Sequence, residues 1–285
     1  MAFSDLQQRV TSEFALQSLF AKLAPIQDFA HNFRELEDRK GASIVIPNFS
    51  LSAAAPFNAD SNNYCGGTNE IDSATLNLNK HYVKSLVVTD RDLAETEIQF
   101  YRDGGTAIGD ALGRAVYGEV ISALAGAEGT LSADVTLTSK QAFADLFSTT
   151  YEKGLDIAEA VLMLSPANYA KALGTLDAYV YGGSEAVRGG RIDGLYGFKS
   201  VVCAPNLGAG IEGYIVDRNS VGVAARYLAP MAGAYVATWQ TSDPNSGFPI
   251  GFRAFEELCK GYRVLAGETL FGVKVLRPAG VVKLV

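Results

Sequence analysis

The segment from Gly208 to Gly213 matches GxGxxG, the spacing at which glycine-rich turns bind nucleotide phosphates. That chemistry needs a helix that starts within the motif, because the helix N-terminus meets the pyrophosphate. The motif is followed here by Tyr214, Ile215 and Val216, which favour a strand. We therefore predict a glycine-rich turn between two strands, with a nucleotide-dependent α/β enzyme as the alternative from another functional class.

Other side chains suited to catalysis or metal binding do not form a constellation. Neither His31 nor His81 has a partner at a metal-ligand spacing. Cys203 follows two valines in a predicted strand, where a thiol belongs to the core more often than it acts as a nucleophile. The acidic pairs near position 90 are expected to form a solvated first helical turn; they are Asp90, Asp92, Glu95 and Glu97. We predict no enzymatic activity, metal or cofactor.

The amino-acid composition narrows the remaining functional classes. The chain has 285 residues, 48% hydrophobic and 19% charged, with a net charge of −7. Phosphate binding needs clustered Lys and Arg, so direct binding to nucleic acid is disfavoured. Three widely spaced cysteines exclude a dense disulfide framework and fit a reducing compartment. With no signal peptide and no apolar run of about 18 residues, we expect a soluble protein made inside the cell, without a membrane partner.

Residues 74–89 alternate with a period of two over an unusual length. At about 3.3 Å per residue, a single strand here would span roughly 50 Å, more than twice a typical strand. We predict one leg of a projecting hairpin, whose middle is not buried in its own core because lysines interrupt the apolar row. The alternative is two ordinary strands joined by a turn near Lys80 and His81. The even positions include Leu76, Leu78, Lys80, Tyr82 and Lys84.

The remaining elements follow from apolar periodicity and from helix and turn signals. Residues 3–38 predict an arm of short helices interrupted by Pro25, or alternatively a helical cap on the domain. The pair Gly104 and Gly105 separates a helix at 91–102 from a long one at 106–125. A glycine- and proline-rich loop is expected at 226–251. Further helices are predicted at 140–152 and from 166 to Gly174, and strands at 43–47, 160–164, 198–204, 213–218, 220–225, 269–276 and 281–285.

The order of these elements resembles the HK97-fold major capsid proteins of tailed bacteriophages. The likeness rests on segments 75–90, 160–169, 190–202 and 270–278. It implies an α+β, HK97-like capsid fold with an N-terminal arm, an extended β-hairpin loop, a peripheral domain with a long spine helix, and an axial α/β domain. The implied boundaries are 1–40 for the arm, 41–89 for the extended loop, 90–136 for the peripheral domain, 137–263 for the axial domain and 264–285 for returning peripheral strands.

The resemblance also implies function. Such a chain self-assembles, as pentamers and hexamers, into an icosahedral capsid that encloses phage DNA without sequence-specific binding. A separate scaffolding protein and a portal are the expected partners, and assembly is expected in the cytoplasm of the bacterial host, with the virion capsid as final location. An encapsulin-type nanocompartment shell is the near alternative. The extended loop of one subunit is expected to lie over its neighbour and to bury Leu76, Leu78 or Tyr82 there. The candidate subunit contacts are Leu76, Leu78, Lys80, Tyr82, Lys84, Arg188 and Arg191.

Overall fold

The computed structural model describes the chain in eleven stretches. They are residues 5–32, 43–49, 71–127, 131–133, 140–175, 191–193, 197–218, 220–230, 235–243, 247–257 and 262–285.

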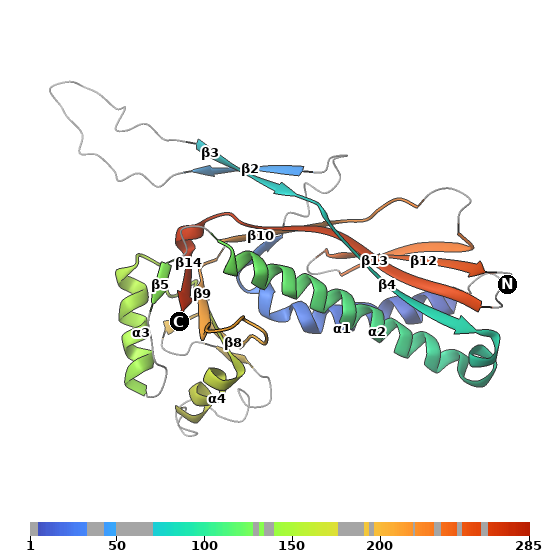
Figure 1. The fold of residues 1–285 in the computed structure, drawn as a ribbon, viewed down its shortest axis with the longest axis horizontal. Coiled ribbons are helices and arrows are strands. Elements are labelled where there is room, and N and C mark those ends of the chain that lie inside the picture. The colour runs from blue at the N-terminus through green and yellow to red at the C-terminus, as the bar shows by residue number, and fades with distance from the viewer. Residues whose placement is uncertain are drawn as a thin grey trace.

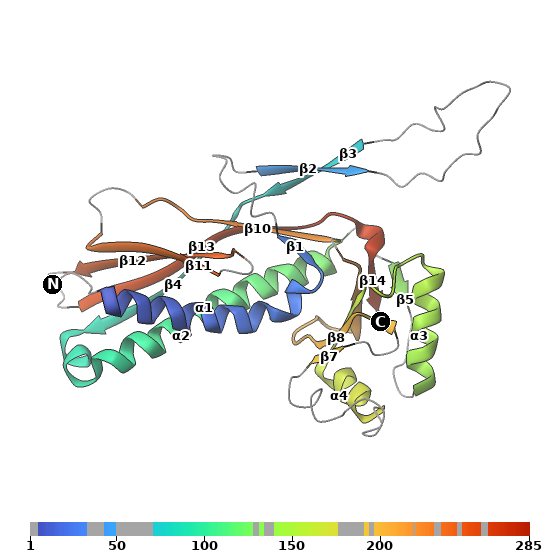
Figure 2. The same ribbon diagram turned by 180° about the vertical axis from the view of Figure 1, so that it is seen from behind.

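One sheet and two long helices form the larger part of the molecule (Figure 1). The sheet has the strand order β1-β10-β13-β12-β11, and β4 adds to it by pairing with β13. The helices α1 and α2 lie side by side against one face of this sheet, as the view from behind also shows (Figure 2). The elements are α1 Asp5–Gln27, β1 Ala30–Asn32, β4 Lys80–Thr89, α2 Asp90–Ala125, β10 Val221–Arg226, β11 Ala237–Ser242, β12 Pro249–Glu257 and β13 Tyr262–Val275.

Glycines do not break the long helix, contrary to the sequence prediction. α2 runs unbroken for 36 residues through Gly104 and Gly105. Gly105, Gly109 and Gly113 recur every four residues, so they share one helix face. A Cβ on Gly109 would lie 2.1 Å from the Ala15 carbonyl oxygen. These glycines therefore let the backbones of α1 and α2 approach closely.

The N-terminal segment is one helix rather than an arm of short helices. α1 has 23 residues, and Pro25 lies in its last turn, where it removes only one helical hydrogen bond. Its side chains Leu19, Leu23 and Ile26 are buried in the main core. The helical-cap alternative describes α1 correctly.

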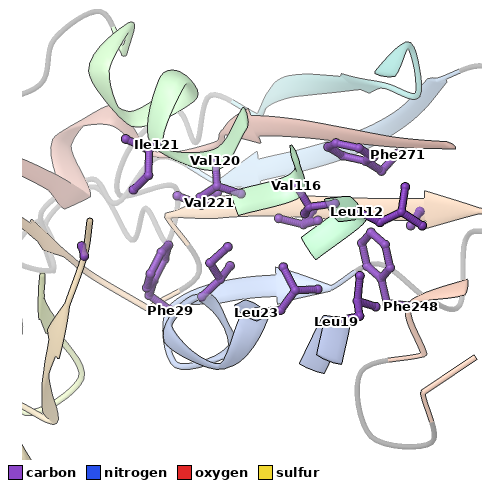
Figure 3. Close-up of a cluster of buried hydrophobic side chains, with 14 of the residues drawn as sticks. Leu19, Leu23, Phe29, Leu112, Val116, Val120, Ile121, Val221, Phe248 and Phe271 are labelled. Carbon is purple, nitrogen blue, oxygen red and sulfur yellow. The ribbon is translucent and has the colours of Figure 1, made fainter. Parts of the chain in front are cut away.

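The main hydrophobic core lies between the two helices and the sheet (Figure 3). Apolar positions repeat every four residues along α2, which places them on a single stripe. This stripe meets Leu19, Leu23 and Phe29 of the N-terminal segment on one side and Phe271 of β13 on the other. The stripe consists of Ile108, Leu112, Val116, Val120 and Leu124.

Asp110 of α2 links the two helices through an ion pair with Lys22 of α1. This contact leads to a testable prediction. The Asp110 carboxylate lies 3.2 Å from Lys22 Nζ of α1 and 2.8 Å from Arg114. Burial would raise the pKa of Asp110, but the hydrogen bonds from Lys22 and Arg114 outweigh it and lower the pKa below its usual range.

A carboxyl group with a lowered folded-state pKa stabilises the protein above its unfolded pKa, and that stabilisation is lost as the pH falls through the folded value. Asp110→Asn should therefore cost about 0.5–1 kcal/mol of unfolding free energy at pH 7. The difference from the parent chain should vanish below about pH 3. Urea unfolding at several pH values measures both, and a pH-independent difference would contradict the assignment.

A second six-stranded sheet forms the other end of the molecule (Figure 1). Its order is β5-β14-β9-β6-β8-β7, and its own hydrophobic cluster includes Phe143 and Leu146 of α3 and Tyr169 of α4. The predicted helix at 140–152 is confirmed. The elements are β5 Leu131–Ala133, α3 Lys140–Glu152, β6 Val161–Leu164, α4 Pro166–Thr175, β7 Arg191–Asp193, β8 Ser200–Cys203, β9 Gly213–Val216 and β14 Val281–Leu284.

The strands of the two sheets do not follow the predicted domain boundaries. β10, β11 and β12 fall within 137–263 but pair in the sheet that carries the long helices. β14 falls within 264–285 but pairs with β9 of the other sheet. The chain thus crosses between the sheets several times, and linear boundaries do not capture this.

The predicted loop at 226–251 also contains regular structure. β11 occupies its middle, and β12 begins at Pro249, directly within the glycine- and proline-rich stretch. Trp239 of β11 stacks on Phe252 of β12 with ring centroids 5.2 Å apart. Packing of these rings on the sheet outweighs the local turn signals, so the loop prediction is wrong here.

The segment 74–89 is two strands, and they belong to different sheets. β3 (Ile71–Asn77) pairs with β2 (Ser43–Phe49) in a two-stranded hairpin, whereas β4 pairs with β13. The predicted single long strand is therefore broken at residues 78–79, although no turn reverses the chain there. β2 also continues through Pro47, which a two-stranded ribbon tolerates because both of its strands are edges. The hairpin projects on the sheet face opposite to α1 and α2 (Figure 1).

Candidate functional site

The GxGxxG segment is a turn, as predicted, and no helix begins in it. Gly208 and Gly210 have φ values of 106° and 74°, which L side chains rarely adopt. Strand β9 starts at Gly213, where a Cβ would lie 2.4 Å from the Met163 carbonyl oxygen. The glycines thus serve a tight turn and close strand packing, and the helix N-terminus that a nucleotide site needs is missing from this motif.

Among the residues that the structure describes, the other chemistry-bearing side chains show no catalytic arrangement. In the part of the chain that the structure describes, no three His, Cys, Asp or Glu side chains gather as metal ligands. Burial raises the pKa of Cys203, which disfavours the thiolate that a nucleophile requires. None of the described helices combines the length and apolar character needed to cross a bilayer.

Outside the two hydrophobic cores, the base of the β2–β3 hairpin, residues 76–82, combines a close backbone contact, buried apolar side chains and polar contacts. We call it the hairpin root. Here the chain crosses β13 on the outer face of the sheet, which is the face opposite to α1 and α2. It then joins the edge of the sheet as β4. A Cβ on Gly272 would lie 2.2 Å from the Asn77 carbonyl oxygen and 3.3 Å from Leu78 Cα. Only a glycine at this position lets the two backbone segments touch.

Leu76 and Leu78 fasten the outer side of the root. Leu76 is fully buried and Leu78 is 7% exposed, in a small cluster with Ile44 of β2 and Ala224 of β10. The prediction that a neighbouring subunit buries these two leucines is therefore wrong. The chain covers them itself, because the apolar side of the hairpin folds down onto the sheet.

Glu119 of α2 fastens the inner side of the root. Tyr82 Oη donates a hydrogen bond of 2.5 Å to Glu119 Oε1, and Lys80 Nζ lies 3.0 Å from Glu119 Oε2. The Tyr82 ring also stacks on Phe271 at 5.7 Å between centroids. The hydrogen bond from Tyr82 and the one from Lys80 lower the pKa of Glu119 below its usual range, against partial burial. The same hydrogen bond raises the pKa of Tyr82. We call Glu119, Lys80 and Tyr82 the root clamp.

The predicted contact residues are thus not equivalent. Lys80 and Tyr82 bind Glu119 of their own chain, whereas Lys84 is exposed. Arg188 lies outside the described residues. The backbone of Arg191 pairs with Val202 at the edge of the second sheet.

Exposed apolar side chains mark the free surface of the hairpin and of β4. Val45 of β2 is 61% exposed, and Val83 and Val87 of β4 are 54% and 57% exposed. Val45 lies on the hairpin face opposite to the buried Ile44, because successive residues of a strand alternate in direction.

The same outer face of the sheet carries an ionic network that the sequence prediction missed. Glu268 of β13 is 5% exposed and forms an ion pair with Arg253 of β12, with Arg253 Nε 2.6 Å from Glu268 Oε1. His81 Nε2 lies 3.2 Å from the other carboxylate oxygen, and Arg253 also donates a hydrogen bond to the Tyr235 hydroxyl. These residues come from separate segments of the sequence, so no local spacing of residues predicts the network. Glu119 and Gly272 were missed for the same reason.

The sequence matches a family model described as phage capsid protein over residues 73–284. This match runs from within β3 to β14 and therefore includes the hairpin root, the larger sheet except β1, the whole second sheet and α2 to α4. No curated protein matches the sequence significantly.

Solved capsid structures share the fold. The capsid of the cyanophage P-SCSP1u aligns with a TM-score of 0.58 and 16% identity, covering 91% of this chain and 86% of that one. The capsid of Ralstonia phage GP4 aligns with a TM-score of 0.57 and 10% identity over 90% and 86% of the chains. A virus-like particle from Pyrococcus furiosus aligns with a TM-score of 0.58 and 11% identity over 99% and 100%. The predicted HK97-like fold is confirmed, and the chain belongs to the phage capsid protein family, as a structural capsid subunit rather than an enzyme.

Proposed function

We propose that copies of this chain assemble, as pentamers and hexamers, into an icosahedral shell in which the β2–β3 hairpin of one subunit lies over its neighbour. The observation that carries this proposal is the hairpin itself. It projects from the sheet, its inner face is buried on its own chain, and its outer face exposes Val45. Apolar surface on a projecting element is typical of a contact with another copy.

The exposed side of β4 extends this contact surface. Val83 and Val87 lie on one face of β4, and Lys84 is exposed on the opposite face of the same strand. Of the predicted contacts, Lys84, Arg188 and Arg191 remain candidates for subunit contacts. Lys80 and Tyr82 would act indirectly, through the root clamp.

We further propose that the shell encloses phage DNA without binding specific sequences, that a separate scaffolding protein and a portal take part in assembly, and that assembly takes place in the cytoplasm of the bacterial host. The net charge of −7 supports a wall that does not adhere to its cargo, because like charges repel DNA phosphates. The family match over residues 73–284 favours this cargo over the protein cargo of a nanocompartment.

The hairpin contact is tested with Val45→Asp. A charge placed in an apolar contact has to be desolvated without a partner, which opposes association. Each shell repeats the contact many times, so we expect the yield of closed shells to fall about tenfold or more. Because Val45 is 61% exposed, the free energy of unfolding should change by less than about 0.5 kcal/mol. Electron microscopy and urea unfolding measure the two effects.

Ser43→Asp is the matched control. Ser43 is exposed on the same face of the same strand, so this variant adds the same charge without removing apolar surface. It should assemble better than Val45→Asp. Normal shell yields from Val45→Asp would refute the proposed hairpin contact.

The cargo is tested separately, by treating particles from infected cells with nuclease and then extracting them. Protected DNA of uniform length is the expected result. Particles that contain a protein cargo and no protected DNA would instead identify a nanocompartment.

A further inference from the structure

At its root the hairpin continues into β4, which pairs with β13, and its apolar side packs on the sheet through Ile44, Leu76 and Leu78. Towards the sheet, Leu78 packs beside Ala224, and the backbone at Asn77 rests on Gly272. Both contacts are apolar or steric, so they fix the height of the hairpin above the sheet. Neither is directional, and neither by itself sets the angle at which the hairpin leaves β13.

The root clamp supplies a directional contact on the other side of the crossing. The carboxylate of Glu119 accepts the hydrogen bond of the Tyr82 hydroxyl with one oxygen and pairs with Lys80 through the other. Both partners lie within five residues of Asn77, the last residue of β3. Charge-assisted hydrogen bonds to two oxygens of one carboxylate restrict both distance and rotation.

The clamp also connects two elements with different surroundings. Glu119 lies on α2, whose buried stripe packs into the main core, so its backbone position is fixed by residues such as Val116 and Val120. Tyr82 is held from the other side by stacking on Phe271. The clamp therefore ties the start of β4, and with it the hairpin, to a helix that is packed into the main hydrophobic core.

We propose that Glu119 is a positioning residue that fixes the direction in which the β2–β3 hairpin leaves the sheet, and thereby the geometry of the contact with the neighbouring subunit. The second half of this inference rests on the proposed function of the hairpin. Without the clamp, the apolar packing of Ile44, Leu76 and Leu78 and the steric contact at Gly272 still hold the root, but none of these contacts is directional. The angle of the hairpin then varies, and neighbouring subunits meet at a range of angles instead of one.

The direction of the hairpin is measured in the full-length, unassembled chain by distances between two spin labels. One label replaces Val45 on the hairpin and the other replaces Arg114, whose side chain is 70% exposed on α2. The three native cysteines are replaced by alanine. With Glu119→Ala we expect the width of the distance distribution to grow about twofold. Glu119→Gln keeps an acceptor for Tyr82 but loses the charge for Lys80. The width of its distance distribution should therefore lie between that of the parent chain and that of Glu119→Ala.

Asp103→Asn is the control on the same helix. Asp103 is 69% exposed and binds Arg102 beside it, away from the hairpin. Its distance distribution and its particles should equal those of the parent chain. Thermal unfolding of each variant establishes that it is folded before distances are compared.

Electron microscopy of assembled particles provides the second readout. Glu119→Ala should give shells of mixed diameter, whereas the parent chain should give one. A Glu119→Ala distribution as narrow as that of the parent chain would overturn the positioning role. A broad distribution with uniform, normal particles would overturn the link to the neighbouring subunit. Failure of the proposed hairpin contact is recognised independently, as normal shells from Val45→Asp, in which the clamp is intact.

Discussion

Gly109→Ala is expected to destabilise the protein strongly, although alanine is the best helix former. The added methyl carbon would lie 2.1 Å from the Ala15 carbonyl oxygen, and backbone on both sides prevents an easy adjustment. The helices α1 and α2 would have to separate, which weakens the packing of Leu19 and Leu112 on the shared core. We expect a loss of about 2–4 kcal/mol in unfolding free energy. Urea unfolding monitored by circular dichroism measures it.

Gly118→Ala is the matched control, because it is the same substitution in the same helix. A Cβ at Gly118 meets nothing within 4 Å, and the residue is exposed. Only the higher helix propensity of alanine then matters, so the unfolding free energy of this variant should rise by about 0.5–1 kcal/mol. The two substitutions thus have opposite expected signs. Equal effects at both positions would show that the close approach of α1 to α2 is not what requires glycine at position 109.

Gly272→Val is expected to abolish normal shell assembly. Valine favours strands, so β13 itself tolerates it locally. Its Cβ, however, would lie 2.2 Å from the Asn77 carbonyl oxygen, where the chain crosses the strand. The hairpin root must lift from the sheet, which uncovers Leu76 and Leu78 and misplaces Val45. We expect a loss of about 1–3 kcal/mol in stability and a decrease of about tenfold or more in shell yield.

Hydrogen exchange locates the change, since amides at 71–77 should lose protection while those of the second sheet keep theirs. Lys274→Val is the control two residues along the same strand, on the same face but exposed, and it should assemble normally. Normal shells and normal protection at 71–77 in Gly272→Val would contradict the described crossing.

Local sequence patterns predicted the elements that a single periodicity controls. Helix 140–152 was predicted with the bounds that α3 has, and the glycine turn before β9 was recognised because strand-forming residues follow it. The long apolar stripe from Ile108 to Leu124 correctly indicated a buried helix.

The errors occurred where tertiary contacts override local signals. Gly104 and Gly105 are helix breakers by propensity, yet α2 continues through them because glycines at 105, 109 and 113 admit α1. The predicted break rests on the adjacent pair Gly104 and Gly105, whereas the spacing of four from Gly105 to Gly113 is the signal of a close helix pair. Similarly, the alternation across 74–89 is real, but periodicity does not state which sheet a strand joins.

The candidate site was predictable only in part. The alternating segment pointed to residues 76–84, but the sequence gives no indication that Leu76 and Leu78 are covered by their own chain. Glu119, Gly272 and Glu268 lie far from the hairpin in sequence, and only the folded chain brings them to it. Long-range polar partners of this kind require the topology to be known first.

Electron microscopy of the full-length chain, expressed alone and together with the proposed scaffolding protein, tests most directly whether this chain assembles into shells. We expect closed icosahedral shells built from this chain, in which density for the β2–β3 hairpin lies over an adjacent subunit. Isolated, folded monomers under both conditions, with no shells, would contradict this expectation.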